Sequence, residues 1–207
     1  ISSDNIAVIS GPNHAEEIIA GKASATVIAS INRKFATELQ EIFSSDVFRV
    51  YTSEDIIGVQ VGGAVKNIIA IASGLCIGLD LGDNTQAALV SRGMNEISSL
   101  DALFNMKNRT LYGLSGLGDL VATCYSQYSR NRELGIIISQ GETVDQAKKN
   151  IGMISEGINT CKIIHKISSK NNIEMPICNE VYKILFEESN PKDSITKLMT
   201  RSLKVED

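Results

Sequence analysis

Residues 58–74, GVQVGGAVKNIIAIASG, constrain the fold most, because one lysine stands in the middle of an almost entirely apolar run of helical length. The apolar residues lie on nearly every side of such a helix, which is typical of a buried central helix rather than of an amphipathic surface helix. The preceding residues 52–55 form a capping-box pattern that predicts a helix from Ser53 onward. We therefore expect the chain to fold around this helix.

Lys66 lies on the same helix face as Gly62 and Gly63, one turn earlier. Each glycine costs roughly 1 kcal/mol relative to alanine in a helix interior. That cost is understandable if another helix or a substrate approaches the backbone closely at this point.

Two interpretations of Lys66 follow from this position. Burial disfavours the charged form of a lysine, so that the amine can take a proton from an alcohol and return it. Alternatively, the side chain reaches the surface or pairs with a buried carboxylate, and the glycines only allow tight helix packing. The spacing alone favours neither interpretation.

The first 52 residues predict an α/β segment, in which short apolar runs alternate with helical patterns. Strands are expected at residues 5–10, 25–30 and 47–51. The first helix has Asn13 and Glu16 in capping-box positions, and Asn32 caps the second. The apolar stripe of the second helix predicts four buried residues: Phe35, Leu39, Ile42 and Phe43. Three strands are few for a complete sheet, so the segment is expected to be the end of a larger domain.

The pattern changes after Thr52, and residues 53–207 predict an all-α domain. Helices are expected at residues 83–104, 115–125, 129–140 and 155–170, together with a short one capped by Thr143 and Gln146. Pro176 and Pro191 are at positions typical of the first turn of the last two helices. The predicted fold class is therefore mainly α, with a short α/β segment in front.

Composition narrows the class of protein. The 207 residues carry a net charge of -4, and no basic stripe is available for nucleic-acid binding. Four widely separated cysteines without a CxxC pair predict neither a metal site nor a disulfide framework and favour the cytoplasm. No signal peptide or membrane span is predicted. The start at Ile1, without methionine, suggests a fragment.

Asp119 is the first further candidate for chemistry. It follows two glycines in LSGLGDL at residues 114–120, at the entry to a helix. The carboxylate could orient a lysine or accept a hydrogen bond from a substrate hydroxyl. It could equally be a helix-start acid that the dipole favours.

Ser129, Arg130 and Asn131 form a second candidate site. They open a helix, so free backbone N–H groups, a hydroxyl, an amide and a guanidinium come together there. That combination suits a phosphate, although a capped surface helix with solvated arginines gives the same pattern. Glu156, which precedes Gly157, is a weaker candidate, and an acid in the first turn of a helix is the alternative interpretation.

Five motifs together resemble the bacterial NAD(P)-dependent glycerol-3-phosphate dehydrogenases. They are SGPNHAEE at residues 10–17, FRVYTSEDIIGVQVGGAVKNIIAIASG at 48–74, GLSGLGDLVATC at 113–124, SRNRELG at 129–135 and SEG at 155–157. The resemblance covers the later part of that family's chain. The glycine-rich dinucleotide loop is not among these residues.

The resemblance implies a function and a domain organisation. Residues 1–52 would end a Rossmann-type NAD(P)-binding domain, and residues 53–207 would form the substrate-binding and catalytic domain. The reaction would interconvert dihydroxyacetone phosphate and sn-glycerol 3-phosphate by hydride transfer with NAD or NADP, and would supply glycerol 3-phosphate for phospholipid synthesis. The protein would be cytoplasmic, without a membrane span or nucleic-acid partner, and could form a homodimer.

The resemblance also implies the roles of individual residues. Lys66 matches the catalytic lysine, which would shuttle the proton of the C2 hydroxyl. The substrate-binding positions would be Gly11, Asn13, Lys66, Asp119, Ser129, Arg130 and Asn131. The cofactor-binding positions would be Ala15, Arg130, Ile154 and Glu156. Asn13 departs from the serine or threonine that is often found at its position.

Two rival functions remain at this point. The polypeptide could be only a helical binding or dimerisation module, or part of a two-domain dehydrogenase that acts on a hydroxy acid. Because no glycine-rich loop is present to hold a dinucleotide, the 207-residue chain alone is expected to be inactive.

Overall fold

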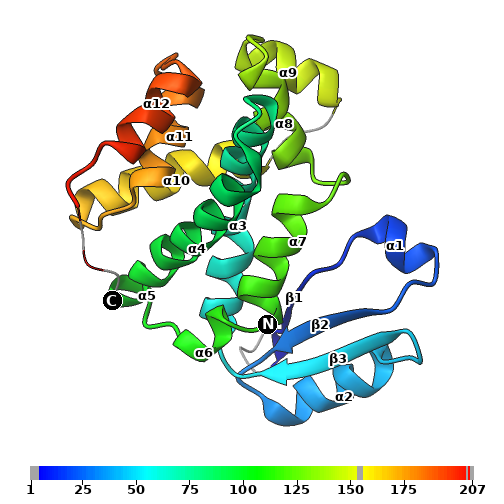
Figure 1. The fold of residues 1–207 in the computed structure, drawn as a ribbon. Helices are drawn as coiled ribbons and strands as arrows, with labels where there is room; N and C mark the ends of the chain where they lie inside the picture. Colours follow the sequence, from blue (N-terminus) through cyan, green and yellow to red (C-terminus); the bar gives the residue numbers. More distant parts are fainter. Residues whose placement is uncertain (1–4, 153–155, 204, 206–207) are drawn as a thin grey trace.

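Figure 1 shows a small sheet with its helices beside a larger assembly of helices. The computed structural model describes residues 5–152, 156–203 and 205. The small part consists of β1 (Val8–Ser10), α1 (Ala15–Ile19), β2 (Ser24–Ala29), α2 (Arg33–Phe43) and β3 (Phe48–Ser53). The larger part consists of α3 (Ile56–Gly78), α4 (Gly82–Ser99), α5 (Asp101–Phe104), α6 (Asn108–Leu111), the π-helical turn Leu114–Gly118, α7 (Asp119–Tyr125), α8 (Arg130–Ser139), α9 (Val144–Ile151), α10 (Glu156–Lys170), α11 (Pro176–Phe186) and α12 (Pro191–Met199). The prediction of a mainly helical chain behind a short α/β segment is confirmed.

The sheet has the strand order β1-β2-β3. β1 pairs antiparallel with β2, so that Val8 lies opposite Ala29, and β2 pairs parallel with β3, so that Ser24 lies opposite Phe48. The parallel pair needs a crossover, which α2 supplies. Each strand overlaps its predicted position, but β1 is shorter than expected and β3 continues to Ser53.

The two helices of the small part depart from the sequence prediction in detail. Asn32 caps α2 as expected, since its Oδ1 accepts the backbone N–H of Phe35 at 3.1 Å. The predicted cap of α1 is wrong, because His14 precedes that helix without a capping hydrogen bond. Asn13 instead belongs to a tight turn, in which its N–H donates to the carbonyl of Gly11 at 2.7 Å.

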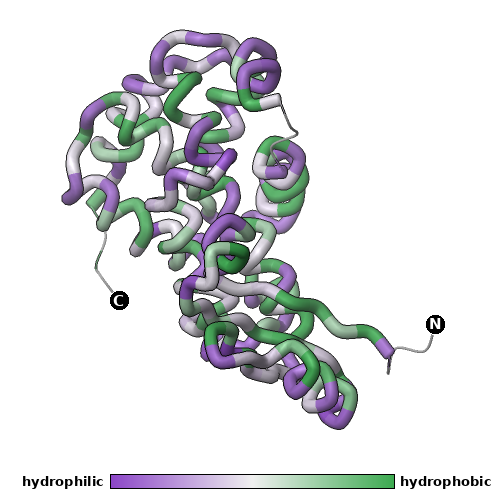
Figure 2. Tube along the Cα trace, turned by 90° about the vertical axis from the view of Figure 1, so that its right-hand side faces the viewer, coloured by the Kyte–Doolittle hydropathy of each residue, from purple (hydrophilic) through white to green (hydrophobic). Residues whose placement is uncertain are grey.

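The predicted buried stripe of α2 is also partly wrong. Ile42 is 72% exposed and Phe43 is 51% exposed, whereas Phe35 and Leu39 are half-buried. The helix packs on β2 and β3 around Ala36, and none of the described residues buries its last turn. Figure 2 shows apolar stretches, in green, in the part of the chain near the N-terminus as well as in the helical part.

The central helix α3 begins at Ile56, three residues later than predicted. Ser53 is still in β3, opposite Ala29, so Thr52 and Ser53 are extended and Thr52 is not the cap. Asp55 takes that role: its Oδ1 accepts the N–H of Gly58 at 2.9 Å, and its Oδ2 accepts the N–H of Lys107 at 2.8 Å. One buried carboxylate therefore fixes the helix start and a distant loop.

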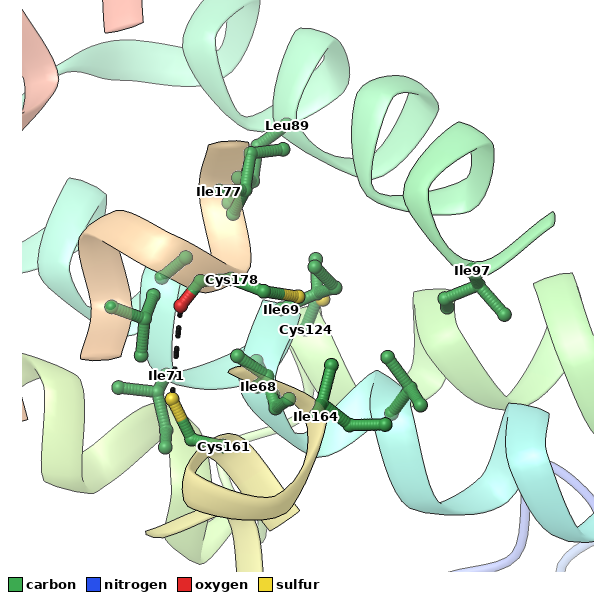
Figure 3. Close-up of a cluster of buried hydrophobic side chains, with 14 of the residues drawn as sticks. Ile68, Ile69, Ile71, Leu89, Ile97, Cys124, Cys161, Ile164, Ile177 and Cys178 are labelled. Carbon is green, nitrogen blue, oxygen red and sulfur yellow. Dashed lines mark hydrogen bonds between the residues drawn. The ribbon is translucent and has the colours of Figure 1, made fainter. Parts of the chain in front are cut away.

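Helix α3 runs through the main apolar core, as its all-round apolar sequence predicts. Figure 3 shows Ile68, Ile69 and Ile71 of this helix among side chains from α4, α7, α10 and α11. In the same view Cys161 Sγ donates to the carbonyl of Cys178 at 3.7 Å. All four cysteines are free and buried, and burial raises the pKa of the Cys161 thiol to about 12.

Helix α3 also packs backbone to backbone against α8. A Cβ on Gly74 would overlap the carbonyl oxygen of Arg132, and a Cβ on Gly135 would overlap that of Ile71. Only glycine permits so close an approach at these two positions. The contact fixes the start of α8 relative to α3, and with it the Ser129 to Asn131 segment.

The remaining helices follow their predicted caps with two corrections. The helix expected over residues 83–104 is broken at Leu100 into α4 and α5. The helix expected over 115–125 starts as the π-helical turn before α7. Ser129 and the Thr143–Gln146 capping box act as predicted, and Pro176 and Pro191 open α11 and α12 as expected. The expected helix start at Ser155 lies outside the described residues.

Helix α3 is long and apolar enough to cross a membrane by length and composition alone. However, 67% of its most apolar window is buried inside the fold. The core helix of a folded domain meets the same criterion, so this is weak evidence for a membrane span.

Candidate active site

The site is built around Lys66, which projects from the middle of α3 and whose side chain is 17% exposed. The two glycines one turn earlier leave room for two other elements. A Cβ on Gly62 would lie 3.1 Å from the carbonyl oxygen of Ser115, in the π-helical turn, and a Cβ on Gly63 would lie 2.9 Å from Ser10 Oγ. The close neighbours of the glycines are therefore the π-helical turn and the end of β1.

Lys66 Nζ forms an ion pair with Asp119 Oδ1. Asp119 is the first residue of α7 and is only 3% exposed, because the π-helical turn carries it over α3. It is thus both a helix-start acid and the partner of the lysine, which were the alternatives from the sequence. An ion pair this buried leaves the ammonium with a fixed direction.

The carboxylate of Asp119 has two further polar neighbours. Ser10 Oγ donates to its Oδ2 at 3.1 Å, and Thr123 Oγ1, which donates to the backbone carbonyl of Asp119 at 2.7 Å, lies 3.3 Å from its Oδ1. Burial raises the pKa of the Asp119 carboxyl above its usual value, and the ammonium of Lys66 is the strongest opposing influence. Ser10 and Thr123 were not identified as site residues from the sequence, although Ser10 opens the SGPNHAEE motif and Thr123 lies one helical turn after Asp119.

The loop after β1 lies beside this ion pair, because Ser10 joins them directly. Gly11 is buried against β2, where a Cβ would lie 3.0 Å from Thr26 Cα. Asn13 Oδ1 and His14 Nε2 are buried and have no hydrogen-bond partner among the described residues. Buried polar atoms left in this condition indicate a ligand or ordered water. Ala15 is exposed at the start of α1.

The start of α8 lies next to that loop, since the rings of His14 and Tyr128 have centroids 6.0 Å apart. Ser129 is buried, and its hydroxyl accepts the N–H of Arg132 at 3.3 Å. Arg130 is exposed at the first position of the helix. The backbone N–H groups of this helix start and the guanidinium are the groups that the sequence suggested for a phosphate.

Asn131 connects the start of α8 with the start of α10. Its Oδ1 accepts the N–H of Gly157 at 3.1 Å, and a Cβ on Gly157 would lie 3.0 Å from the carbonyl oxygen of Asn67 on α3. Glu156, the first residue of α10, is exposed beside this contact. Ile154 lies outside the described residues.

The structure therefore brings most predicted positions to one region, where β1, α3, α7, α8 and α10 meet. Lys66 and Asp119 touch directly. Gly11 and Asn13 follow Ser10, which contacts Asp119. Asn131 accepts a hydrogen bond from Gly157, the residue after Glu156. The fold and this region define a class of protein in which a helical part places a buried lysine–aspartate pair beside the end of a short α/β segment.

Comparison with known proteins identifies the family. Residues 55–196 match the pattern of the NAD-dependent glycerol-3-phosphate dehydrogenase C-terminus, and residues 1–36 match that of the N-terminus of the same family. The chain belongs to the NAD-dependent glycerol-3-phosphate dehydrogenase family. The resemblance seen in the sequence is thereby confirmed.

Individual relatives agree with this assignment. The chain is 48% identical over 201 residues to a glycerol-3-phosphate dehydrogenase [NAD(P)+] of Clostridium botulinum, covering 97% of this chain and 61% of the relative. It is 47% identical to the protein of that name from Fusobacterium nucleatum, covering 97% of this chain and 60% of the relative. The crystal structure of glycerol-3-phosphate dehydrogenase from Coxiella burnetii superposes with a TM-score of 0.91 at 42% identity, covering 94% of this chain and 60% of that one. The chain thus spans about 60% of the length of the relatives it matches.

Proposed function

We propose that the full-length protein interconverts dihydroxyacetone phosphate and sn-glycerol 3-phosphate, with hydride transfer to or from NAD(P). The observation that carries the proposal is the buried pair of Lys66 and Asp119, beside an α3 face that two glycines leave without side chains. Family membership supports the same reaction. A solvated surface lysine would not need this arrangement.

The roles of the two residues follow from their chemistry. When the ketone is reduced, Lys66 gives a proton from its ammonium to the C2 oxygen, and in the reverse direction it takes that proton back. Asp119 fixes the direction of the ammonium and compensates its charge. The nicotinamide cofactor, when bound, supplies or accepts the hydride at C2.

The substrate phosphate is proposed to bind at the start of α8. Ser129, Arg130 and Asn131 would offer backbone N–H groups and a guanidinium there, as charge-assisted phosphate binding requires. Gly11 and Asn13 would line the opposite wall of the site. The buried and unpartnered Oδ1 of Asn13 supports this, because a ligand donor would satisfy it.

The cofactor is proposed to contact Ala15, Arg130, Ile154 and Glu156. Ala15 and Glu156 are exposed at the starts of α1 and α10, so both are accessible to a ligand. His14 Nε2, which is buried without a hydrogen-bond partner among the described residues, lies one position before Ala15 and supports a polar ligand there.

The wider context of the protein is proposed on the same basis. The enzyme would act in the cytoplasm without a membrane span or nucleic-acid partner, and would supply glycerol 3-phosphate for phospholipid synthesis. The enzyme could act as a homodimer. The boundary between the cofactor domain and the helical domain is proposed to fall near residues 52–53.

The reaction can be tested with the full-length protein, by following NADH or NADPH oxidation with dihydroxyacetone phosphate and with a 2-keto acid. Lys66→Met should lower kcat by about a thousandfold or more, since methionine fills a similar volume but carries no proton. Lys34→Met, at an exposed position of α2, is the matched control and should keep the native rate. Preference for the 2-keto acid, or native turnover in Lys66→Met, would contradict the proposal.

A further inference from the structure

Ser10 is the residue through which the small α/β part touches the catalytic ion pair. It is the last residue of β1, and its hydroxyl donates to Asp119 Oδ2 at 3.1 Å across 109 positions of sequence. Lys66 and Thr123 contact the other oxygen, Oδ1. Among the described residues, Ser10 is therefore the side-chain donor that holds Oδ2.

The backbone around Ser10 is fixed by the sheet. Thr26 Oγ1 donates to the carbonyl of Ser10 at 3.1 Å, and the following Gly11 lies so close to β2 that a Cβ would meet Ala25 O at 3.1 Å. The hydroxyl is thus presented from a rigid strand end and not from a mobile loop. A donor held in this way can restrict the rotation of a carboxylate.

The space for the Ser10 hydroxyl is provided by Gly63 on α3. A Cβ at that position would lie 2.9 Å from Ser10 Oγ but 3.8 Å from Ser10 Cβ. Alanine at position 63 would therefore displace the hydroxyl, whereas it would make an ordinary contact with the Cβ alone. Gly63 and Ser10 form a matched pair that can be tested by substitution.

We propose that Ser10 is a positioning residue of the reductase reaction, whose hydroxyl holds the carboxylate of Asp119 and thereby directs the ammonium of Lys66 toward the substrate. The inference rests on the proposed function and goes beyond it, because it makes the end of the α/β part a component of the catalytic unit. Ser10 acts through Asp119 and not on the reacting atoms.

The first experiment compares Ser10→Ala with Ser30→Ala in the full-length protein. Ser10→Ala should lower kcat about tenfold to a hundredfold, the usual range for loss of one hydrogen bond to a charged group, with KM for NAD(P)H changed less than about twofold. Ser30 is the control, because it lies at the end of a strand of the same sheet, is buried, and donates to a backbone carbonyl, that of Ile6, at 2.7 Å. Ser30→Ala should keep the native kcat.

The second experiment adds Gly63→Ala in both backgrounds. In the native background it should lower kcat to a similar extent as Ser10→Ala, although alanine favours the helix. In the Ser10→Ala background it should cause no further loss, so the two effects should be strongly non-additive. Should Ser10→Ala fail to fold, Gly63→Ala alone decides, and a native kcat in that variant overturns the inference.

The outcomes separate the two proposals. If the native protein does not reduce dihydroxyacetone phosphate, the proposed function fails and this inference fails with it. If the native protein is active but Ser10→Ala retains full kcat, or loses no more than Ser30→Ala, only the role of Ser10 is overturned. Additive effects of Ser10→Ala and Gly63→Ala would also overturn it.

Discussion

The helical part and the small α/β part differ in how completely they cover their apolar residues. The main core surrounds α3 and draws buried side chains from α4, α7, α8, α10 and α11. The small part shares a second, smaller cluster with Val59 of α3, in which Val27 and Ala29 are buried, and it also buries Ile28, Ala36 and Val50. Elsewhere in the small part, Ile19 is 86% exposed and Ile9 is 55% exposed. Burial of apolar surface is the main favourable term in folding, so the two parts should differ in stability.

The comparison shows how the site is assembled from unequal partners. Lys66 and Asp119 belong to the well-packed part and hold each other there. Ser10, Gly11 and Asn13 belong to the part with little core of its own, and Ser10 is fixed on Asp119. The small part is therefore expected to depend on its contact with the helical part.

Separating the two parts should have the largest effect. Residues 54–207 should unfold in one cooperative transition, because their core and helix caps are internal. Residues 1–53 should show no such transition, and the 207-residue chain should show no dehydrogenase activity by itself. Thermal unfolding followed by circular dichroism and NAD(P)H fluorescence checks these expectations. A cooperative transition of residues 1–53 would contradict the expected difference in stability between the two parts. Tight NAD(P)H binding by the 207-residue chain would contradict its expected inactivity.

Matched isoleucine substitutions should sharpen the contrast. Ile68→Ala, at a fully buried position of α3, should destabilise the protein by about 2–5 kcal/mol through lost burial and a cavity. Ile42→Ala, at an exposed position of α2, should change stability by less than about 0.5 kcal/mol. Urea unfolding of both variants gives the two values. A large effect at Ile42 would mean that this residue is covered in the full-length protein.

The buried carboxylate of Glu96 should make the stability of the helical part depend on pH. It accepts the N–H groups of Ile177 at 2.6 Å and Cys178 at 3.0 Å at the start of α11, and burial raises its pKa from 4.5 to about 7. The folded state therefore holds the proton more tightly than the unfolded state. Its contribution is fully present below pH 4.5 and is lost as the pH rises to about 7.

This loss should amount to at most about 3 kcal/mol, and urea midpoints measured between these pH values would detect it. Glu96→Gln should reduce the slope of the urea midpoint against pH. Glu41→Gln, at an exposed position of α2, should leave that slope unchanged. Equal slopes in the native protein and in Glu96→Gln would show that Glu96 does not titrate in this window.

Gly21 and Gly152, two of the glycines with positive φ, should give a small effect. Gly21 in the small part and Gly152 in the helical part have φ values of 71° and 70°, and a Cβ at either position would meet open space. Alanine should cost about 1 kcal/mol at each through backbone strain alone. The cost at Gly152 should appear in the main unfolding transition, while that at Gly21 should appear in hydrogen exchange of the sheet. Equal effects of both variants on the main transition would show that the two parts unfold together.

Several features could be predicted from the sequence because they are local. The apolar residues on all sides of residues 58–74 indicated a central helix, and the structure buries it. Asn32, Ser129 and Thr143 were recognised as caps, since capping depends on a few adjacent residues. The motifs around Lys66 and Asp119 also indicated the family before any contact was known.

Only the tertiary structure decided which residues meet. Asp119 lies 53 positions from Lys66, and Ser10 lies 109 positions from Asp119, so periodicity and caps could not reveal either contact. Helix α3 begins at Ile56 and not at the predicted Ser53, because β3 pairs with β2 through Ser53. The exposure of Ile42 and Phe43 depends on what packs over α2 and not on their spacing. Local sequence determined the helices and the lysine in their centre, whereas long-range packing determined the partner of that lysine.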